Sequence, residues 1–263
     1  MTLPVAIYLT SKLIFFSYLI QSLEIFHLSR QPSFQKIWSY ANLSPDLEAG
    51  LPIGKAFIIS VFSNNALVKI SEIQILLATA GLIFPHWIFL GPLIVLQLLV
   101  GIRFRGSFNG GSDIMTFVVA TGTLVALASS TEKGQTLGLL YIAVHTLYSY
   151  FKSGISKLSS ADWLRGLALS GFLKRSLFVN VQKYSEVLAS HYFLSAFMCW
   201  MIISFELFSA VLLFYPGPVY FYFFAAIIFH CLIYFTFGLN RFLWIWLSAW
   251  PATLFSISML NSR

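Results

Sequence analysis

Cations, hydroxyls and a carboxylate gather in one otherwise apolar part of the chain, the stretch YSYFKSGISKLSSADWLRGLAL at residues 148–169. An ionisable side chain in the hydrocarbon of a membrane costs about 2.5–3.5 kcal/mol, so its retention indicates a function or a specific partner. Two interpretations of Lys157 stay open. It snorkels to the membrane surface, as lysines do at helix ends, or it is a general base whose neutral amine is favoured by partial desolvation and the nearby cation Lys152.

Further candidates are ionisable side chains inside apolar stretches, namely Lys69, Glu72, Asp113, His145, Lys152, Glu206 and His230. Lys69 and Glu72 are one turn apart and are expected to form a structural ion pair, with the lining of a pathway as the alternative. Glu206 has no local partner, so it is protonated or paired with a cation from another helix, such as Lys152 or Lys69. A structural pair and a proton-handling role both remain open for it.

For each of the two candidate histidines, His145 and His230, a structural role in an inter-helix hydrogen bond stands beside a functional role. His145 shares a helix face with Tyr148 and Lys152, at spacings i, i+3 and i+7. His230 precedes Cys231, but no second Cys or His lies at metal-ligand spacing, so we expect an inter-helix hydrogen bond and no metal site.

The composition excludes a soluble domain. The 263 residues are 58% hydrophobic and 10% charged, whereas soluble domains carry about 25% charged residues. The net charge of +7 comes without a basic helix or an aromatic RNA-binding pattern, so we expect no nucleic-acid partner. Basic residues outside the helices instead act as topology signals. The expected partner is the lipid bilayer.

The elements that position these residues are predicted to be transmembrane helices, which need about 20 apolar residues each. We expect one all-α domain over residues 1–263, a polytopic transmembrane helical bundle of about eight spans. The spans cover residues 4–28, 66–84, 86–102, 112–130, 137–156, 192–215, 219–238 and 242–260. Interfacial amphipathic helices are predicted at 33–43 and 174–188. The first span is expected to be retained rather than cleaved as a signal peptide.

Three motifs carry a resemblance to a known family. GISKLSSADWLRG, residues 154–166, resembles the signature Gly-Val-Lys-Lys-Leu-Asp-Ala-Asp-Trp-x-x-Gly of vitamin K-dependent gamma-carboxylase. FHCLIYFTFGLNRFLWIWLSAWPATLF, residues 229–255, is similar to the carboxylase segment that starts Phe-His-Cys and ends Ser-Pro-Leu-Phe. SFNGGSD, residues 107–113, resembles its Ser-Trp-Asn-Asn-His-Ser. The chain is therefore identified as resembling the HTTM domain, the membrane module that this carboxylase shares with many bacterial proteins.

The resemblance implies roles for particular residues. Lys157 matches the lysine that deprotonates a hydroquinone so that oxygen can attack and an epoxide can form, while Ser156 replaces the preceding lysine. Asn109 matches a quinone-site asparagine. Gly111 stands where the carboxylase has the histidine that assists addition of carbon dioxide, which argues against true glutamate carboxylation. Lys157 is thus the expected catalytic base. The residues expected to line a site for a reduced naphthoquinone are Asn109, Lys152, His145 and His230.

Because the sequence stops just after its last predicted span, we expect a protein without the soluble lumenal domain by which the carboxylase grips a propeptide. A standalone, bacterial-type HTTM protein is therefore expected in a multi-pass arrangement, in the cell inner membrane if it is bacterial. Two functions remain open. One is a quinol-dependent oxygenase or a maturation factor for a small secreted peptide. The alternative is a non-catalytic membrane partner, or a quinone- or lipid-binding protein. The positive-inside rule, applied to the basic residues between the predicted spans, places Lys157 on the cytoplasmic side. The carboxylase works on the lumenal side, so the side of the membrane that Lys157 faces also stays open.

Overall fold

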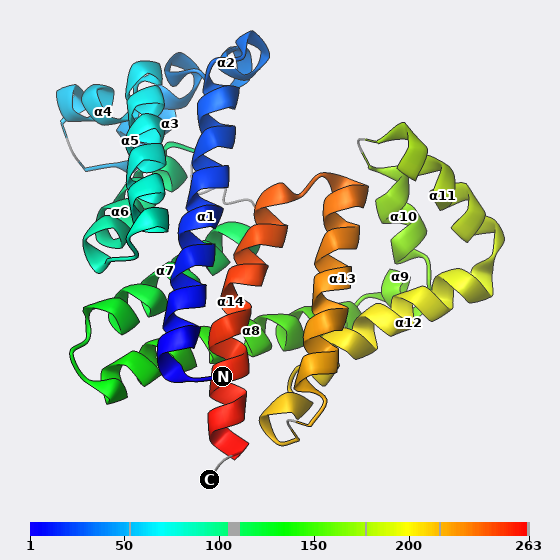
Figure 1. The fold of residues 1–263 in the computed structure, drawn as a ribbon. Helices are drawn as coiled ribbons and strands as arrows, with labels where there is room; N and C mark the ends of the chain where they lie inside the picture. Colours follow the sequence, from blue (N-terminus) through cyan, green and yellow to red (C-terminus); the bar gives the residue numbers. More distant parts are fainter. Residues whose placement is uncertain (53, 105–110, 177, 216, 262–263) are drawn as a thin grey trace. The chain divides into compact units, whose positions relative to one another are not determined.

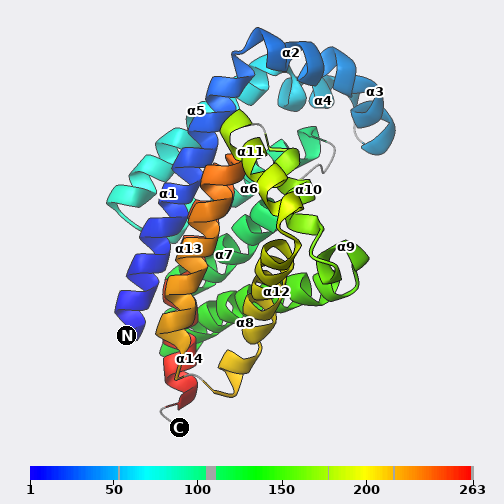
Figure 2. The same cartoon turned by 90° about the vertical axis from the view of Figure 1, so that its right-hand side faces the viewer.

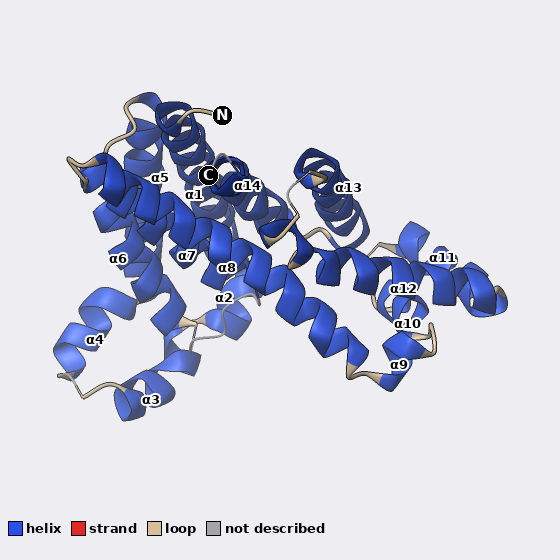
Figure 3. Cartoon of the chain, turned by 90° about the horizontal axis from the view of Figure 1, so that it is seen from below, coloured by secondary structure: helices blue, strands red, loops and turns tan. Residues whose placement is uncertain are grey.

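A computed structural model describes residues 1–52, 54–104, 111–176, 178–215 and 217–261, and within these ranges every regular element is helical (Figure 3). The predicted all-α class is confirmed. The helices, labelled in Figure 1, are α1 (Leu3–Ser29), α2 (Pro32–Trp38), α3 (Tyr40–Gly50), α4 (Lys55–Phe62), α5 (Asn64–Ile83), α6 (Trp87–Arg103), α7 (Gly111–Ala128), α8 (Glu132–Leu158), α9 (Ala161–Leu164), α10 (Ala168–Lys174), α11 (Val179–Ser190), α12 (Tyr192–Phe208), α13 (Val219–Phe237) and α14 (Asn240–Asn261).

Six of these helices are long and apolar enough to cross a membrane: α1, α5, α7, α12 with the 3-10 turn that follows it, α13 and α14. They make the chain a multi-pass membrane protein. The other two predicted spans are also helices but do not meet the same criteria. Helix α6 has 17 residues, and α8, although 27 residues long, carries charged residues towards both of its ends.

The helices fall into two compact units, an N-terminal unit of Thr2–Leu139 and a C-terminal unit of Leu140–Arg263 that also includes Met1. In the N-terminal unit α1 packs along α5 (Figure 1). Apart from Leu67, the residues that α5 buries are small or polar and lie at helical spacing: Ser71, Gln74, Ala78 and Gly81. Small residues let two membrane helices approach closely where no hydrophobic driving force holds them together.

Cations inside the N-terminal unit are bound by backbone carbonyls. Lys12 donates to the carbonyl oxygens of Leu82 and Ile83, which end α5, where the helix dipole favours a cation. Arg103 is 2% exposed and donates to the carbonyl of Phe62, which ends α4, and to that of Trp38 at 3.1 Å. Arg103 therefore joins α6 to the short helices.

The predicted local pairing of Glu72 is corrected by the structure. Glu72 lies 3.6 Å from Arg30, which directly follows α1, rather than pairing with Lys69 on its own helix. Both members are half exposed, and exposed ion pairs of this kind contribute about 0–1 kcal/mol.

Both predicted interfacial segments are helical, but each is two helices. The first divides at Ser39, which caps α3 by accepting a hydrogen bond from the Asn42 amide. The second divides between α10 and α11, where Ser176 donates to the carbonyl of Thr236 at 2.6 Å. In the C-terminal unit α10 packs on α11, and α13 packs along α14 (Figure 2).

Candidate functional site

One face of α8 carries the side chains that build the candidate site. Tyr150, Ser153, Gly154 and Lys157 follow one another at i, i+3, i+4 and i+7. Residues at this spacing lie on the same side of a helix, one above the other. This side is the buried one, since Tyr150 and Gly154 are buried and Ser153 and Lys157 are half-buried.

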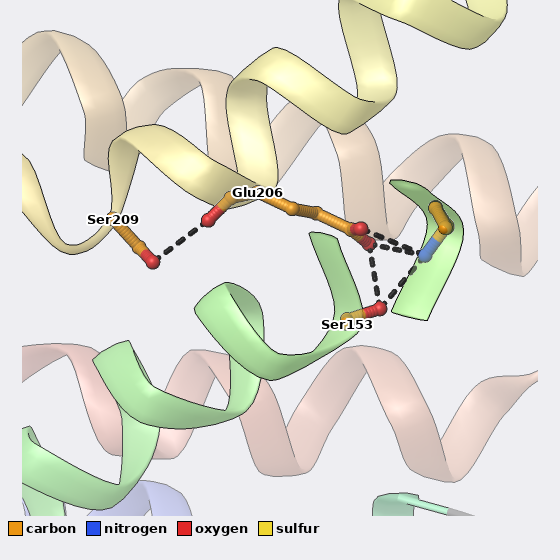
Figure 4. Close-up of polar contacts among 4 residues, drawn as sticks. Ser153, Glu206 and Ser209 are labelled. Carbon is orange, nitrogen blue, oxygen red and sulfur yellow. Dashed lines mark hydrogen bonds and ion pairs between the residues drawn. The ribbon is translucent and has the colours of Figure 1, made fainter. Parts of the chain in front are cut away.

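Lys157 and Glu206 form an ion pair between α8 and α12 (Figure 4). The Lys157 ammonium donates to both carboxylate oxygens of Glu206, at 2.8 and 2.7 Å, and to Ser153 Oγ at 2.7 Å. Ser153 in turn donates to Glu206 Oε1 at 3.0 Å. Each of the three ammonium protons therefore has its own acceptor. The side chain of Glu206 is 4% exposed and that of Lys157 is 18% exposed, so the carboxylate is the more deeply enclosed partner.

The pair depends on a close crossing of α8 over α12. A Cβ atom at Gly154 would lie 2.9 Å from Leu207 Cδ2 and 3.0 Å from the Leu207 backbone nitrogen, so glycine permits this approach. Ser209 donates to the carbonyls of Leu147, at 3.0 Å, and Glu206, at 2.7 Å. The end of α12 is therefore tied to α8 at Leu147 and at Gly154, both of which precede Lys157 along α8.

Trp163 lies beside the lysine of the ion pair. Its ring centroid is 5.0 Å from Lys157 Nζ, within the range of a cation–π contact. Trp163, from the Asp-Trp part of the motif GISKLSSADWLRG, thus contacts Lys157 of the same motif.

Further along the same face of α8, Tyr150 is the centre of an aromatic cluster. Its ring contacts five other rings from α12, α13 and α14, those of Phe205, Tyr222, His230, Trp246 and Trp250, with centroids 4.6–6.4 Å away. His230 stacks on Trp246 at 5.2 Å. We use the name Tyr150 cluster for these six residues.

A single hydrogen bond of 2.5 Å joins Tyr150 Oη to His230 Nε2 in the cluster. The indoles of Trp246 and Trp250 are donors and cannot accept the hydroxyl proton. With the imidazole proton on Nδ1, Tyr150 donates and Nε2 accepts, and with the proton on Nε2 the direction is reversed. Within the described residues, His230 Nδ1 is buried without a hydrogen-bond partner.

Tyr150→Phe is expected to lower the free energy of unfolding by about 1–3 kcal/mol, because it leaves the buried Nε2 of His230 without its hydrogen-bond partner. Unfolding by SDS in mixed micelles measures the change. The matched control is Tyr148→Phe, which removes the same hydroxyl from a side chain that is 56% exposed on α8 and should change the value by less than about 0.5 kcal/mol. Equal effects of the two substitutions would contradict the assigned hydrogen bond.

The residues predicted for the site do not all come together. Lys157 and His230 lie on or against the buried face of α8 described above. His145 packs on Tyr141 at 4.5 Å, and Lys152 is exposed. Five residues of helix separate Lys152 from Lys157 by about 140° around the axis, so the structure does not bring them together. Asn109 lies outside the described residues.

Sequence reasoning missed Tyr150, Ser153 and the pairing of Glu206 with Lys157. The i, i+3, i+4, i+7 spacing of the α8 residues is visible in the sequence. Lys157 was instead interpreted together with Lys152, which lies on the helix face of His145. In the part of the chain that the structure describes, no three His, Cys, Asp or Glu side chains meet as metal ligands.

Comparison of the chain with protein-family models, with curated proteins and with solved structures gave no match.

Proposed function

We propose that this chain is an HTTM-type membrane protein that handles a quinol, with the Lys157–Glu206 pair as its proton-exchanging group. The observation that supports the proposal is that an enclosed carboxylate, Glu206, pairs with a half-buried lysine on the same face of α8 as Tyr150, the centre of a cluster of aromatic rings. A planar, apolar ring with two hydroxyl groups matches both features, since aromatic side chains stack on rings and an acid–base pair exchanges protons.

In this function the ion pair first rearranges. A proton moved from Lys157 to Glu206, 2.7 Å away, leaves a neutral amine and a carboxylic acid. The amine then takes a proton from a quinol hydroxyl, and Ser153 holds the amine in place through its hydroxyl. Molecular oxygen is the oxidant. One of its atoms enters the quinone epoxide, and the other leaves as water with the two quinol protons.

The test is epoxidation of a reduced naphthoquinone by the purified protein in the presence of oxygen, with the product identified by mass spectrometry. The comparison is between Lys157→Ala and Lys152→Ala, which remove the same side chain from different sides of α8. Circular dichroism establishes that each variant is helical. We expect epoxide from the wild type and from Lys152→Ala, and none from Lys157→Ala. A folded wild type that forms no epoxide would overturn the oxygenase function.

A second candidate is a protein without catalytic activity, either a membrane partner of another protein or a quinone- or lipid-binding protein. One observation favours it: all three ammonium protons of Lys157 already have acceptors, so the pair is built as a stable anchor. Binding of an oxidised naphthoquinone, followed by quenching of tryptophan fluorescence, with no epoxide formed from the quinol, would select this candidate.

Two finer parts of the proposal rest on the resemblance alone. They are the place in the inner membrane of a bacterium and a small secreted peptide as the partner whose maturation needs this protein. Neighbouring genes for a short secreted peptide and an exporter would support the peptide, whereas neighbouring respiratory genes would favour quinone binding.

A further inference from the structure

Helices α9, α10 and α11, residues 161–190, form a surface segment between α8 and α12 that is not among the helices able to span a membrane. We call it the interfacial segment. Its described residues include four basic side chains, Arg165, Lys174, Arg175 and Lys183, and two acidic ones, Asp162 and Glu186. All six are exposed. The segment is therefore a net cationic surface.

Contacts with two membrane-spanning helices fix the place of this segment. Ser195, in the first turn of α12, donates to the carbonyl of Gly166 at 2.5 Å. Ser176 donates to the carbonyl of Thr236 at the end of α13. Because α12 and α13 are consecutive spans, the start of the first and the end of the second lie on the same side of the bilayer. The interfacial segment therefore lies at the membrane surface on that side.

Exposed apolar side chains stand among the cations. Val179 is 67% exposed and Tyr184 62% exposed on α11, and Phe172 is 49% exposed on α10. Bulk water would leave these side chains unburied, whereas the hydrocarbon would strongly disfavour each charge. The headgroup layer accommodates both kinds of side chain, because lysine and arginine reach outward while apolar groups enter the acyl boundary.

The four cations lack protein counterions. Among the described residues, none of them has a carboxylate oxygen within 4.0 Å. Lipid phosphates supply negative charge at this depth. In a zwitterionic headgroup a positive group offsets the phosphate charge, whereas an anionic headgroup keeps a net negative charge. We propose that the interfacial segment binds the headgroups of anionic phospholipids through Lys174, Arg175 and Lys183, with Phe172, Val179 and Tyr184 entering the acyl boundary.

The test uses the full-length protein in detergent and native mass spectrometry, with phosphatidylglycerol and phosphatidylcholine added separately. The variant is Lys174→Gln/Lys183→Gln. The control, Lys133→Gln/Lys152→Gln, removes the same charge from two exposed lysines outside both predicted interfacial segments. A lysine near an anionic surface contributes about 1 kcal/mol, so the variant should bind phosphatidylglycerol about tenfold to thirtyfold more weakly. Its affinity for phosphatidylcholine should not change.

Wild type and control are expected to prefer phosphatidylglycerol, and the preference should fall as salt is added, because salt screens exposed charges. A wild type without this preference would overturn the proposal, and so would an equal loss in both double variants. Unfolding by SDS at the same midpoint as wild type shows that the variant is folded. The result does not depend on the quinol function, which is measured with a different substrate at Lys157.

Discussion

Lys157→Met is expected to lower the free energy of unfolding by about 3–5 kcal/mol, because it leaves the Glu206 carboxylate enclosed without its counterion. Methionine keeps the length and the apolar stem of lysine, so the loss is of charge rather than of volume. The Glu206 side chain is 4% exposed and cannot move to water without separating α12 from α8. SDS titration in mixed micelles measures the change. The matched control is Lys152→Met on the exposed side of the same helix, which should change the value by less than about 0.5 kcal/mol.

Substitution of Glu206, the partner of Lys157, should lower the free energy of unfolding by less. In Glu206→Gln the ammonium of Lys157 loses one charge partner, but its side chain is 18% exposed and can extend toward the surface. We expect about 1–3 kcal/mol, the cost of a weakened hydrogen bond to a charged group. The double variant Lys157→Met/Glu206→Leu should recover most of the loss, because apolar replacement of a buried ion pair is often neutral or stabilising. Additive losses in the double variant would show that the two residues are not coupled.

The helical membrane fold was predictable because it depends on composition. Few charges and long apolar stretches give spanning helices whatever the tertiary contacts are, and α1, α5, α7, α12, α13 and α14 lie where the sequence placed them. The division of the second interfacial segment was not predictable. It occurs where Ser176 bonds to Thr236, 60 residues away, and no local pattern contains that contact.

The candidate site was predictable only in part, for a similar reason. The cost of a charge in the membrane singled out Lys157 and Glu206 separately. Their pairing depends on how α8 crosses α12 at Gly154, and a single sequence does not specify a contact between two residues 49 positions apart. Sequence reasoning therefore proposed Lys152 and Lys69 as partners of Glu206, and it gave Tyr150 no role although that residue is the centre of the aromatic cluster.

Gly166→Ala is expected to lower the free energy of unfolding by about 2–5 kcal/mol for two reasons. Gly166 has φ of +73°, a left-handed conformation that costs a residue with a Cβ about 1–2 kcal/mol. The added Cβ would also lie 2.4 Å from Ala196 Cα on α12, and forcing packed backbones apart costs about 1–3 kcal/mol. This glycine joins α9 to α12, so the substitution should also loosen the contact of Trp163 with Lys157.

The control for this substitution is Gly171→Ala in α10, where no atom lies within 4 Å of the added Cβ. Alanine in a helix interior is favoured over glycine by about 0.5–1 kcal/mol, so Gly171→Ala should be neutral or stabilising. The two substitutions add the same methyl group five residues apart and should have opposite signs in the same SDS titration. Ser195→Ala measures the contribution of the hydrogen bond to the Gly166 carbonyl, because it removes this bond without moving the backbone. It should lower the free energy of unfolding by about 1 kcal/mol. If Gly166→Ala behaved like Gly171→Ala, α9 would not be held against α12, and the position of the interfacial segment at the ends of α12 and α13 would lose one of its two supports.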